Sequence, residues 1–314
     1  MMEILKPPKL THGDLISIIA PASSVSDDSL IQKSFNYFEK LGYKVKLGKN
    51  VYQKRGYLAG TDEQRLEDIH DSFYDMNIKA IFCLRGGYGS ARLLDKIDYN
   101  LIKRNPKIFV GYSDITSLQM AFLQKTKLVT FSGPMTATDF IVDLDPNAED
   151  FFWRIVTSNK KIGKISNTNS EKFITIKKGR NEGNLIGGNL SIILSLFGTG
   201  YLPLLKNFIL LLEEINESPY KIDRMLNQLR LGRFFNNMRG VILGKFVDCC
   251  EHDSNKKTLS VNEVILDYFG KMDIPIINNF MYGHINEKLT IPFGINCKLN
   301  ASRLGVEILE AAVV

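Results

Sequence analysis

Ser113 is the residue most suited to chemistry in this chain. It stands in Gly111-Tyr112-Ser113-Asp114, between the apolar run 108–110 and a helical run that starts at Ile115. A serine on a sharp strand-to-helix turn projects its hydroxyl into a cleft, where the first helix amides face any oxyanion formed beside it. The match to the G-x-S-x-G pattern is partial, because Ile115 occupies the second glycine position. The turn therefore predicts either a nucleophile at Ser113 or a helix N-cap at Ser113 or Asp114.

A glycine-rich loop, Arg85-Gly86-Gly87-Tyr88-Gly89, follows the apolar run 80–84. Glycine lets backbone amides approach an oxyanion closely, so this loop is a candidate oxyanion donor. It matches neither G-x-G-x-x-G nor the lysine-bearing P-loop, which leaves little support for a phosphate cradle. A tight turn with no catalytic role is the third interpretation.

A serine nucleophile needs a base that titrates near neutral pH, and the chain has four histidines. His12 precedes the first predicted strand, His70 lies in a charged helix, and His252 lies among charged residues in a predicted loop. His284 instead follows an apolar segment where a strand gives way to a loop. It is the predicted base, with an ordinary turn histidine as the alternative.

The third partner of such a site is a carboxylate that fixes the imidazole tautomer. Leu210-Leu211-Leu212-Glu213-Glu214 ends a strongly apolar strand in two acids. Either acid could serve, and simple termination of the strand by charge is the alternative. The order Ser, Glu, His matches the α/β-hydrolases, although the same geometry occurs in several chain orders.

The elements that must position these residues indicate an α/β protein. In the first half, short apolar runs alternate with helical patterns, which predicts an open, doubly wound parallel sheet. Its predicted strands are 15–20, 43–47, 80–84, 108–110 and 129–132, and its clearest helices are 30–41 and 61–76. The second half is mixed, with predicted strands 208–212 and 241–246, a helix at 220–231, and an antiparallel, barrel-like tail at 298–300 and 305–309.

These patterns divide the chain of 314 residues into two predicted domains. Residues 1–145 would carry the nucleophile, and residues 180–314 would supply the acid and the base. The lysine-rich stretch 146–179, with one helix near 151–156, is predicted to link them.

Composition sets the remaining limits. A hydrophobic fraction of 44% and a charged fraction of 24% are ordinary for a globular enzyme. The net charge of +6 is scattered, so nucleic-acid binding is not expected. There is no signal-peptide pattern and no apolar stretch of membrane-spanning length, so we expect a cytoplasmic protein that does not contact membrane. The four cysteines form no C-x-x-C pair, which argues against a zinc site or a disulfide framework.

Taken together, the motifs resemble those of the LD-carboxypeptidase family of serine peptidases, which includes murein tetrapeptide carboxypeptidases and microcin C self-immunity proteins. The resemblance covers nearly the whole chain, and the motifs are specific because they occur together and in order. They are Gly13-Asp14, Ala20-Pro21-Ala22-Ser23, Arg85-Gly86-Gly87-Tyr88-Gly89, Gly111-Tyr112-Ser113-Asp114, Ser132-Gly133-Pro134-Met135, Gly187-Gly188-Asn189-Leu190, Leu212-Glu213-Glu214 and Gly283-His284.

The resemblance implies that Ser113 is the nucleophile, Glu213 the orienting acid and His284 the general base. It also implies that amides of Asp114, Gly86 and Gly87 bind the oxyanion. The family commonly has Glu-Asp where this chain has Glu213-Glu214, and Glu217 is a second candidate for the acid.

By similarity, the reaction is hydrolysis of the L,D-amide bond to the terminal D-alanine of cytoplasmic murein tetrapeptide, with no metal or organic cofactor. Arg85 is a sensible clamp for the substrate carboxylate, and Tyr88 and Asn189 are further candidates for substrate binding. A homodimer is expected from the family. Two alternatives stay open: a self-immunity peptidase that cleaves peptidyl or aminoacyl nucleotides, and a noncatalytic protein that binds phosphate or a nucleotide.

Overall fold

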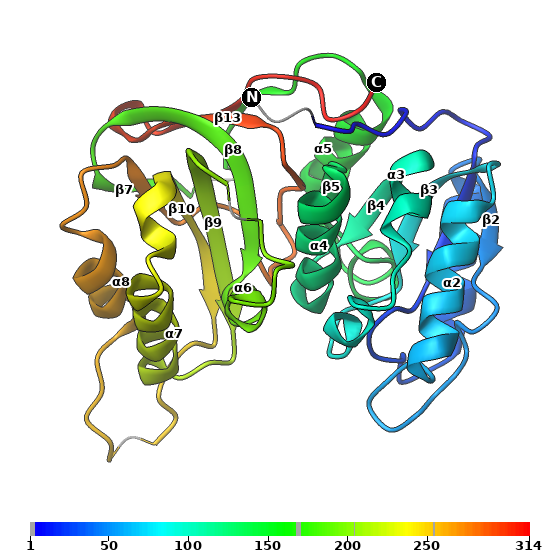
Figure 1. Cartoon of the computed structure of the whole chain (residues 1–314), viewed down its shortest axis with the longest axis horizontal. Helices are drawn as coiled ribbons and strands as arrows, with labels where there is room; N and C mark the ends of the chain where they lie inside the picture. The colour runs from blue at the N-terminus through cyan, green and yellow to red at the C-terminus, as the bar shows by residue number, and fades with distance from the viewer. Residues whose placement is uncertain (1–3, 168–170, 204, 254) are drawn as a thin grey trace.

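The computed structural model describes residues 4–314 except 168–170, 204 and 254. Two sheets lie side by side, with α4 between them (Figure 1). The first has six strands in the order β12-β5-β4-β3-β1-β2. Its strands are β1 (Leu15–Ile19), β2 (Lys44–Leu47), β3 (Ile78–Cys83), β4 (Ile108–Gly111), β5 (Thr130–Ser132) and β12 (Ile291–Phe293). β1 to β5 are parallel, and β12 pairs with β5 antiparallel.

Helices α1 (Ser29–Lys40), α2 (Asp62–Tyr74), α3 (Tyr99–Arg104) and α4 (Thr116–Thr126) join the parallel strands of this first sheet, with short 3-10 helices η1 (Ser90–Leu93) and η2 (Ser113–Ile115). A short π-helix, η3 (Thr136–Phe140), and helix α5 (Pro146–Thr157) follow β5. Helix α2 begins where the sequence predicts, because Thr61 accepts a hydrogen bond from the Gln64 amide and completes a capping box. β3 and β4 are buried almost throughout, as expected for parallel strands covered on both faces.

The second sheet has eight strands in the order β6-β14-β13-β8-β9-β10-β11-β7. They are β6 (Gly163–Ile165), β7 (Ile174–Lys177), β8 (Arg180–Asn189), β9 (Phe208–Ile215), β10 (Met238–Val247), β11 (Ile276–Asn278), β13 (Asn296–Asn300) and β14 (Gly305–Ile308). The central strands β8 to β11 are parallel, and antiparallel strands flank them. Its helices are α6 (Leu190–Leu196), α7 (Pro219–Leu231) and α8 (Val261–Phe269), with turns η4 (Phe234–Asn237) and η5 (Ala301–Arg303). The predicted class, a parallel α/β half followed by a mixed α/β half, is confirmed.

The chain crosses between the two sheets more often than the sequence indicates. Residues 146–179, predicted as a linker, contain α5, β6 and β7. Helix α5 packs on the first sheet's side, where Trp153 stacks on Tyr43 with ring centroids 5.4 Å apart. β12 returns from the second half of the chain to the first sheet.

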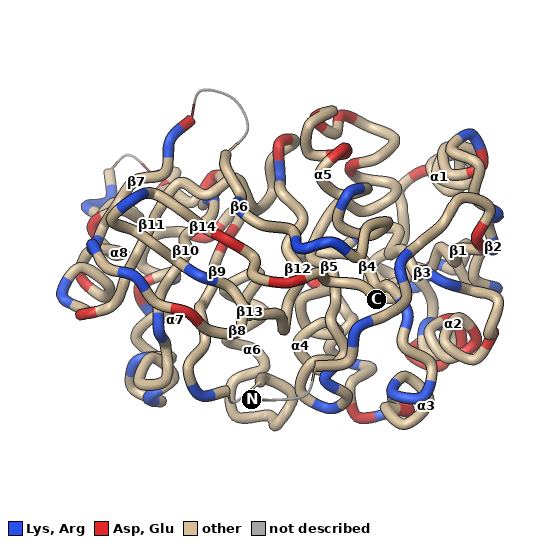
Figure 2. Tube along the Cα trace, turned by 90° about the horizontal axis from the view of Figure 1, so that it is seen from above, with Lys and Arg blue, Asp and Glu red and all other residues tan. Residues whose placement is uncertain are grey.

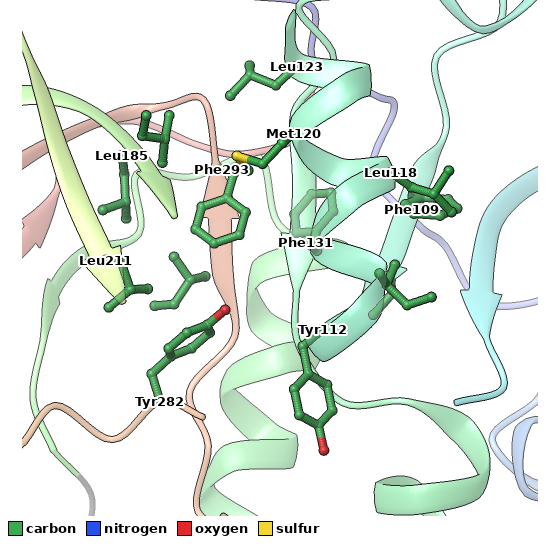
Figure 3. Packing of buried hydrophobic residues seen from close by; sticks show 14 of the residues in the cluster. Phe109, Tyr112, Leu118, Met120, Leu123, Phe131, Leu185, Leu211, Tyr282 and Phe293 are labelled. Carbon is green, nitrogen blue, oxygen red and sulfur yellow. The ribbon is translucent and has the colours of Figure 1, made fainter. Parts of the chain in front are cut away.

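Apolar side chains fill the space between the sheets. Met120 and Leu123 of α4 face Leu185 of β8 and Phe293 of β12 (Figure 3), and all four are buried. Acidic and basic residues are interspersed along the trace when the molecule is viewed from above (Figure 2). The apolar packing sets the relative position of the two sheets, and hence of any site built from both.

Candidate active site

Ser113 stands on a strained turn directly after β4. Its φ of 62° lies in the left-handed region, where a non-glycine residue costs about 1–3 kcal/mol. Tyr112 before it is extended, and Ser113 opens η2. A Cβ on Gly111 would come within 2.8 Å of Ile115 Cγ2. Glycine at position 111 therefore leaves room for the isoleucine that departs from the nucleophile-turn pattern.

Three side chains from distant parts of the chain form one hydrogen-bonded row. Ser113 Oγ lies 3.0 Å from His284 Nε2, and His284 Nδ1 lies 2.8 Å from Glu213 Oε2. Ser113 follows β4 in the first sheet, Glu213 lies near the end of β9 in the second, and His284 lies between β11 and β12. The row thus depends on both halves of the molecule.

The carboxylate in this row is shielded from water. The Glu213 side chain is 1% exposed, against 17% for His284. Its second oxygen, Oε1, has no hydrogen-bond partner among the described residues. Gly283 allows this close packing, because a Cβ there would lie 3.1 Å from Glu213 Oε2 and its φ is +128°. Glu213 Oε2 therefore bonds the imidazole at a point that solvent barely reaches.

The glycine loop packs directly against the serine. A Cβ on Gly86 would lie 3.2 Å from Ser113 Oγ and 3.5 Å from the Asp114 amide nitrogen. The Asp114 carboxylate accepts hydrogen bonds from the amides of Gly89 and Ser90, at 3.3 and 2.9 Å. Burial raises the pKa of that carboxyl, and the Ser90 amide is the largest of the effects that oppose the rise. Asp114 thus holds the loop beside Ser113.

A buried arginine, whose role was not predicted from the sequence, also holds this loop. Arg65 is 1% exposed and donates hydrogen bonds to the carbonyls of Gly89 and Pro21, at 2.8 and 2.7 Å. It also pairs with Asp62 at 2.6 Å. The only signal in the sequence is an arginine within the periodic pattern of helix 61–76, which does not distinguish a buried arginine from an exposed one.

The candidate substrate-binding residues differ in how far they are already bonded. Arg85 is half-buried, makes one long hydrogen bond of 3.4 Å to the Ser24 carbonyl, and has a buried Nε without a partner in the described chain. Tyr88 is 51% exposed, and its ring meets the Tyr57 ring edge-on. Arg85 and Tyr88 are therefore available to a ligand.

Asn189 is engaged within the protein. Its Nδ2 donates to Glu214 at 2.8 Å, and its Oδ1 accepts from Ser191 Oγ and the Ile192 amide at the start of α6. Glu214 also accepts from the Ser191 amide at 2.7 Å. The structure thus uses the motif that contains Asn189 to begin a helix and to hold the second acid of β9.

The competing acids and bases lie elsewhere. Glu217 pairs with Lys221 at 2.9 Å, and Glu214 faces α6. His70 accepts a hydrogen bond from the Asp98 amide, and His252 lies beside Cys250. Of the predicted alternatives, Glu213 and His284 are those that the fold brings to Ser113.

Two features are absent from the part of the chain that the structure describes. No group of three or more histidine, cysteine, aspartate or glutamate side chains there is arranged to hold a metal ion. Within that same part of the chain, no helix combines the length and the apolarity that crossing a membrane requires.

Comparison with known proteins places both halves in one family. The sequence-family model of the LD-carboxypeptidase N-terminal domain matches residues 16–133, and the family model of the C-terminal domain matches residues 182–299. A probable murein peptide carboxypeptidase of Bacillus subtilis is 37% identical, over 98% of this chain and 95% of that protein.

Solved structures agree with this placement. The muramoyltetrapeptide carboxypeptidase of Oxalobacter formigenes superposes with a TM-score of 0.81 and 29% identity, covering 94% of this chain and 97% of that one. MccF in complex with glutamyl sulfamoyl guanosine superposes with a TM-score of 0.87 and 26% identity, covering 99% of this chain and 100% of that one.

Proposed function

The chain belongs to the LD-carboxypeptidase family, as its motifs predict, and from this membership we propose that it is a serine carboxypeptidase that releases D-alanine from cytoplasmic murein tetrapeptide. The observation that carries the proposal is the hydrogen-bonded row of Ser113, His284 and Glu213. The proposed bond is the amide between an L-configured centre and the terminal D-alanine.

In this mechanism Ser113 Oγ attacks the carbonyl carbon while His284 Nε2 accepts the hydroxyl proton. Glu213 keeps the imidazole in the tautomer with its proton on Nδ1 and stabilises the imidazolium that forms. The imidazolium then donates its proton to the departing amine of D-alanine, which leaves an acyl-enzyme on Ser113. A water molecule, deprotonated by His284, completes the hydrolysis.

The tetrahedral intermediate carries a negative oxygen that needs donors already in place. The Asp114 amide and the amides of Gly86 and Gly87 are the proposed donors, since both segments border Ser113 Oγ. Holding these amides rigidly avoids reorganisation during the reaction, and this is the proposed purpose of the Asp114 and Arg65 contacts to the loop.

The substrate ends in a carboxylate, and Arg85 is the proposed clamp for it. A guanidinium binds a carboxylate through two parallel hydrogen bonds. The support is that Arg85 Nε is buried without a partner in the described chain. Tyr88, on the same loop, is the proposed side wall of the substrate site.

The decisive experiment measures D-alanine release from murein tetrapeptide by the wild type, Ser113→Ala and His284→Ala. We expect the wild type to release D-alanine and each variant to lose at least about a thousandfold in kcat/KM. Full activity of either variant would overturn the mechanism.

A second substrate class is favoured by one observation, the superposition on MccF bound to an aminoacyl sulfamoyl nucleoside. Parallel assays with aminoacyl sulfamoyl adenosine separate the two classes, and faster turnover of that compound would reassign the substrate while keeping the mechanism.

Equal labelling of wild type and Ser113→Ala by a fluorophosphonate would favour a noncatalytic binding protein. The homodimer implied by the family stays a prediction, which sedimentation velocity can test.

A further inference from the structure

A buried ion pair lies beside Tyr112, and the mechanism above does not use it. Lys288 Nζ contacts Asp139 Oδ1, and the two side chains are only 4% and 5% exposed. The other oxygen of Asp139 accepts a hydrogen bond from the Met135 amide at 2.8 Å. Burying two charges is costly even when they are paired, so a pair retained here calls for a role other than stability.

Tyr112 connects this pair to the site. Its hydroxyl donates to Asp139 Oδ1 at 3.2 Å, and Lys288 Nζ lies 4.9 Å from the centre of its ring. The ring centroid is 5.0 Å from that of His284. Burial, followed by the charge of Asp139, raises the pKa of Tyr112 well above its ordinary value, so the hydroxyl keeps the proton it donates.

The contacts join the two parts of the molecule that supply the nucleophile and the base. Asp139 lies in η3, just after β5, and Tyr112 directly precedes Ser113. Lys288 lies four residues after His284 on the segment between β11 and β12. The left-handed backbone at Ser113 has to be held by its surroundings, and Tyr112 anchors it on one side as Asp114 does on the other.

We propose that Lys288, Asp139 and Tyr112 are positioning residues that set the distance between Ser113 Oγ and His284 Nε2. This inference rests on the proposed function, because it assigns a role relative to that nucleophile and base. The ion pair ties the His284 segment to η3, and the tilted Tyr112 ring packs against the imidazole. None of the three residues needs to touch the substrate.

The charges around His284 make the proposal testable by pH. Glu213 lies against Nδ1 and Ser113 against Nε2, and the Tyr112 ring packs beside the imidazole with the two planes inclined by 59°. Lys288 and Asp139 both contact Tyr112, at its ring and its hydroxyl. As a neutral pair, Lys288 and Asp139 have little net effect on the imidazole. Removing one member leaves a buried charge that acts through a medium of low dielectric constant.

The experiment measures the rate at which a fluorophosphonate labels Ser113, as a function of pH. Neutral His284 is the active form, so the labelling rate rises with pH to a plateau. The rising part of this pH–rate profile is its acid limb. In Lys288→Met the unpaired Asp139 favours the imidazolium, and the acid limb moves to higher pH. In Asp139→Asn the unpaired Lys288 moves it to lower pH, and the double variant returns it towards the wild-type position.

We also expect the plateau rate of Lys288→Met to fall about 100-fold, since a displacement of roughly 1 Å between reacting groups has an effect of that size. Lys161→Met is the matched control, because Lys161 forms an exposed pair with Glu307 at 2.6 Å, and it should label at the wild-type rate.

Tyr112→Phe, which keeps the ring and loses only the hydroxyl, tests the proposal if the charge variants do not fold. It should label about fivefold more slowly.

A folded Lys288→Met protein with the wild-type rate and acid limb would overturn the proposal, and so would a wild-type rate in Tyr112→Phe. The proposal would also be contradicted if the acid limb of the pH–rate profile moved in the same direction in Lys288→Met and in Asp139→Asn. If the wild type is labelled but releases no D-alanine, the proposed substrate is wrong and the positioning role stands on the labelling data. A wild type that is not labelled at all would overturn both.

Discussion

Replacing Glu213 by glutamine tests the proposed mechanism at its most buried point. The substitution conserves size and removes only the charge and one acceptor. Glu213 Oε2 lies 2.8 Å from His284 Nδ1, and the side chain is 1% exposed. A glutamine amide placed there can donate to Nδ1, which stabilises the tautomer with its proton on Nε2. That tautomer faces Ser113 with a donor and cannot accept the hydroxyl proton.

The size of the effect follows from this geometry. Solvent barely reaches the side chain at position 213 to replace the lost charge, and the imidazolium of the transition state would face a neutral amide. A wrong tautomer in a serine-histidine-carboxylate row lowers kcat by about 10⁴, which corresponds to about 5.5 kcal/mol of transition-state stabilisation. We expect this loss in kcat for D-alanine release, with KM changed little because Glu213 does not touch the substrate.

Glu214→Gln is the matched control on the neighbouring residue. Glu214 is also buried, and burial raises its pKa, but it bonds Asn189 and the Ser191 amide instead of His284. A glutamine there keeps an acceptor oxygen, so we expect kcat to fall less than tenfold. The reasoning is refuted if folded Glu213→Gln keeps more than a tenth of wild-type kcat, or if the two variants lose activity equally.

Three further predictions concern the loop and its supports. Gly86→Ala places a methyl group 3.0 Å from Ser113 Cβ and 3.2 Å from its Oγ, so kcat should fall about 100-fold. A wild-type kcat would show that the loop moves to make room. Gly283→Ala brings a Cβ within 3.1 Å of Glu213 Oε2 at a φ of +128°, so thermal denaturation should show about 1–3 kcal/mol of lost stability together with slower turnover. Hydrogen bonds from Arg92 and then Arg65 lower the pKa of Asp62 to about 2, from 3.8. The Asp62 carboxylate therefore stabilises the fold above about pH 4, and this contribution of about 2 kcal/mol is lost as the pH falls towards 2. Urea denaturation of Asp62→Asn and wild type should differ at pH 7 and converge near pH 2, and a difference independent of pH would contradict the assignment.

Local patterns in the sequence predict much of the fold. The alternation of apolar runs with helical periods predicts the parallel first half, and the capping residue Thr61 marks the start of α2 correctly. The turn at Ser113 and the glycine loop at Gly86 are also local, because each depends on a few consecutive residues at the end of a strand. The family followed from motifs of this kind, taken in order along the chain.

Contacts between distant residues were decided only by the tertiary structure. Adjacent residues on a strand point to opposite faces, so Glu213 and Glu214 could not be distinguished until the pairing of β9 showed which one faces His284. Asn189, a predicted candidate for substrate binding, is bonded within the protein at a helix start. The return of β12 to the first sheet and the contact of Lys288 with Asp139 join residues about 150 positions apart, for which no local period exists. The sequence by itself therefore determined the class of protein and the turn at Ser113, whereas side-chain direction and long-range packing determined which acid and which histidine lie beside that serine.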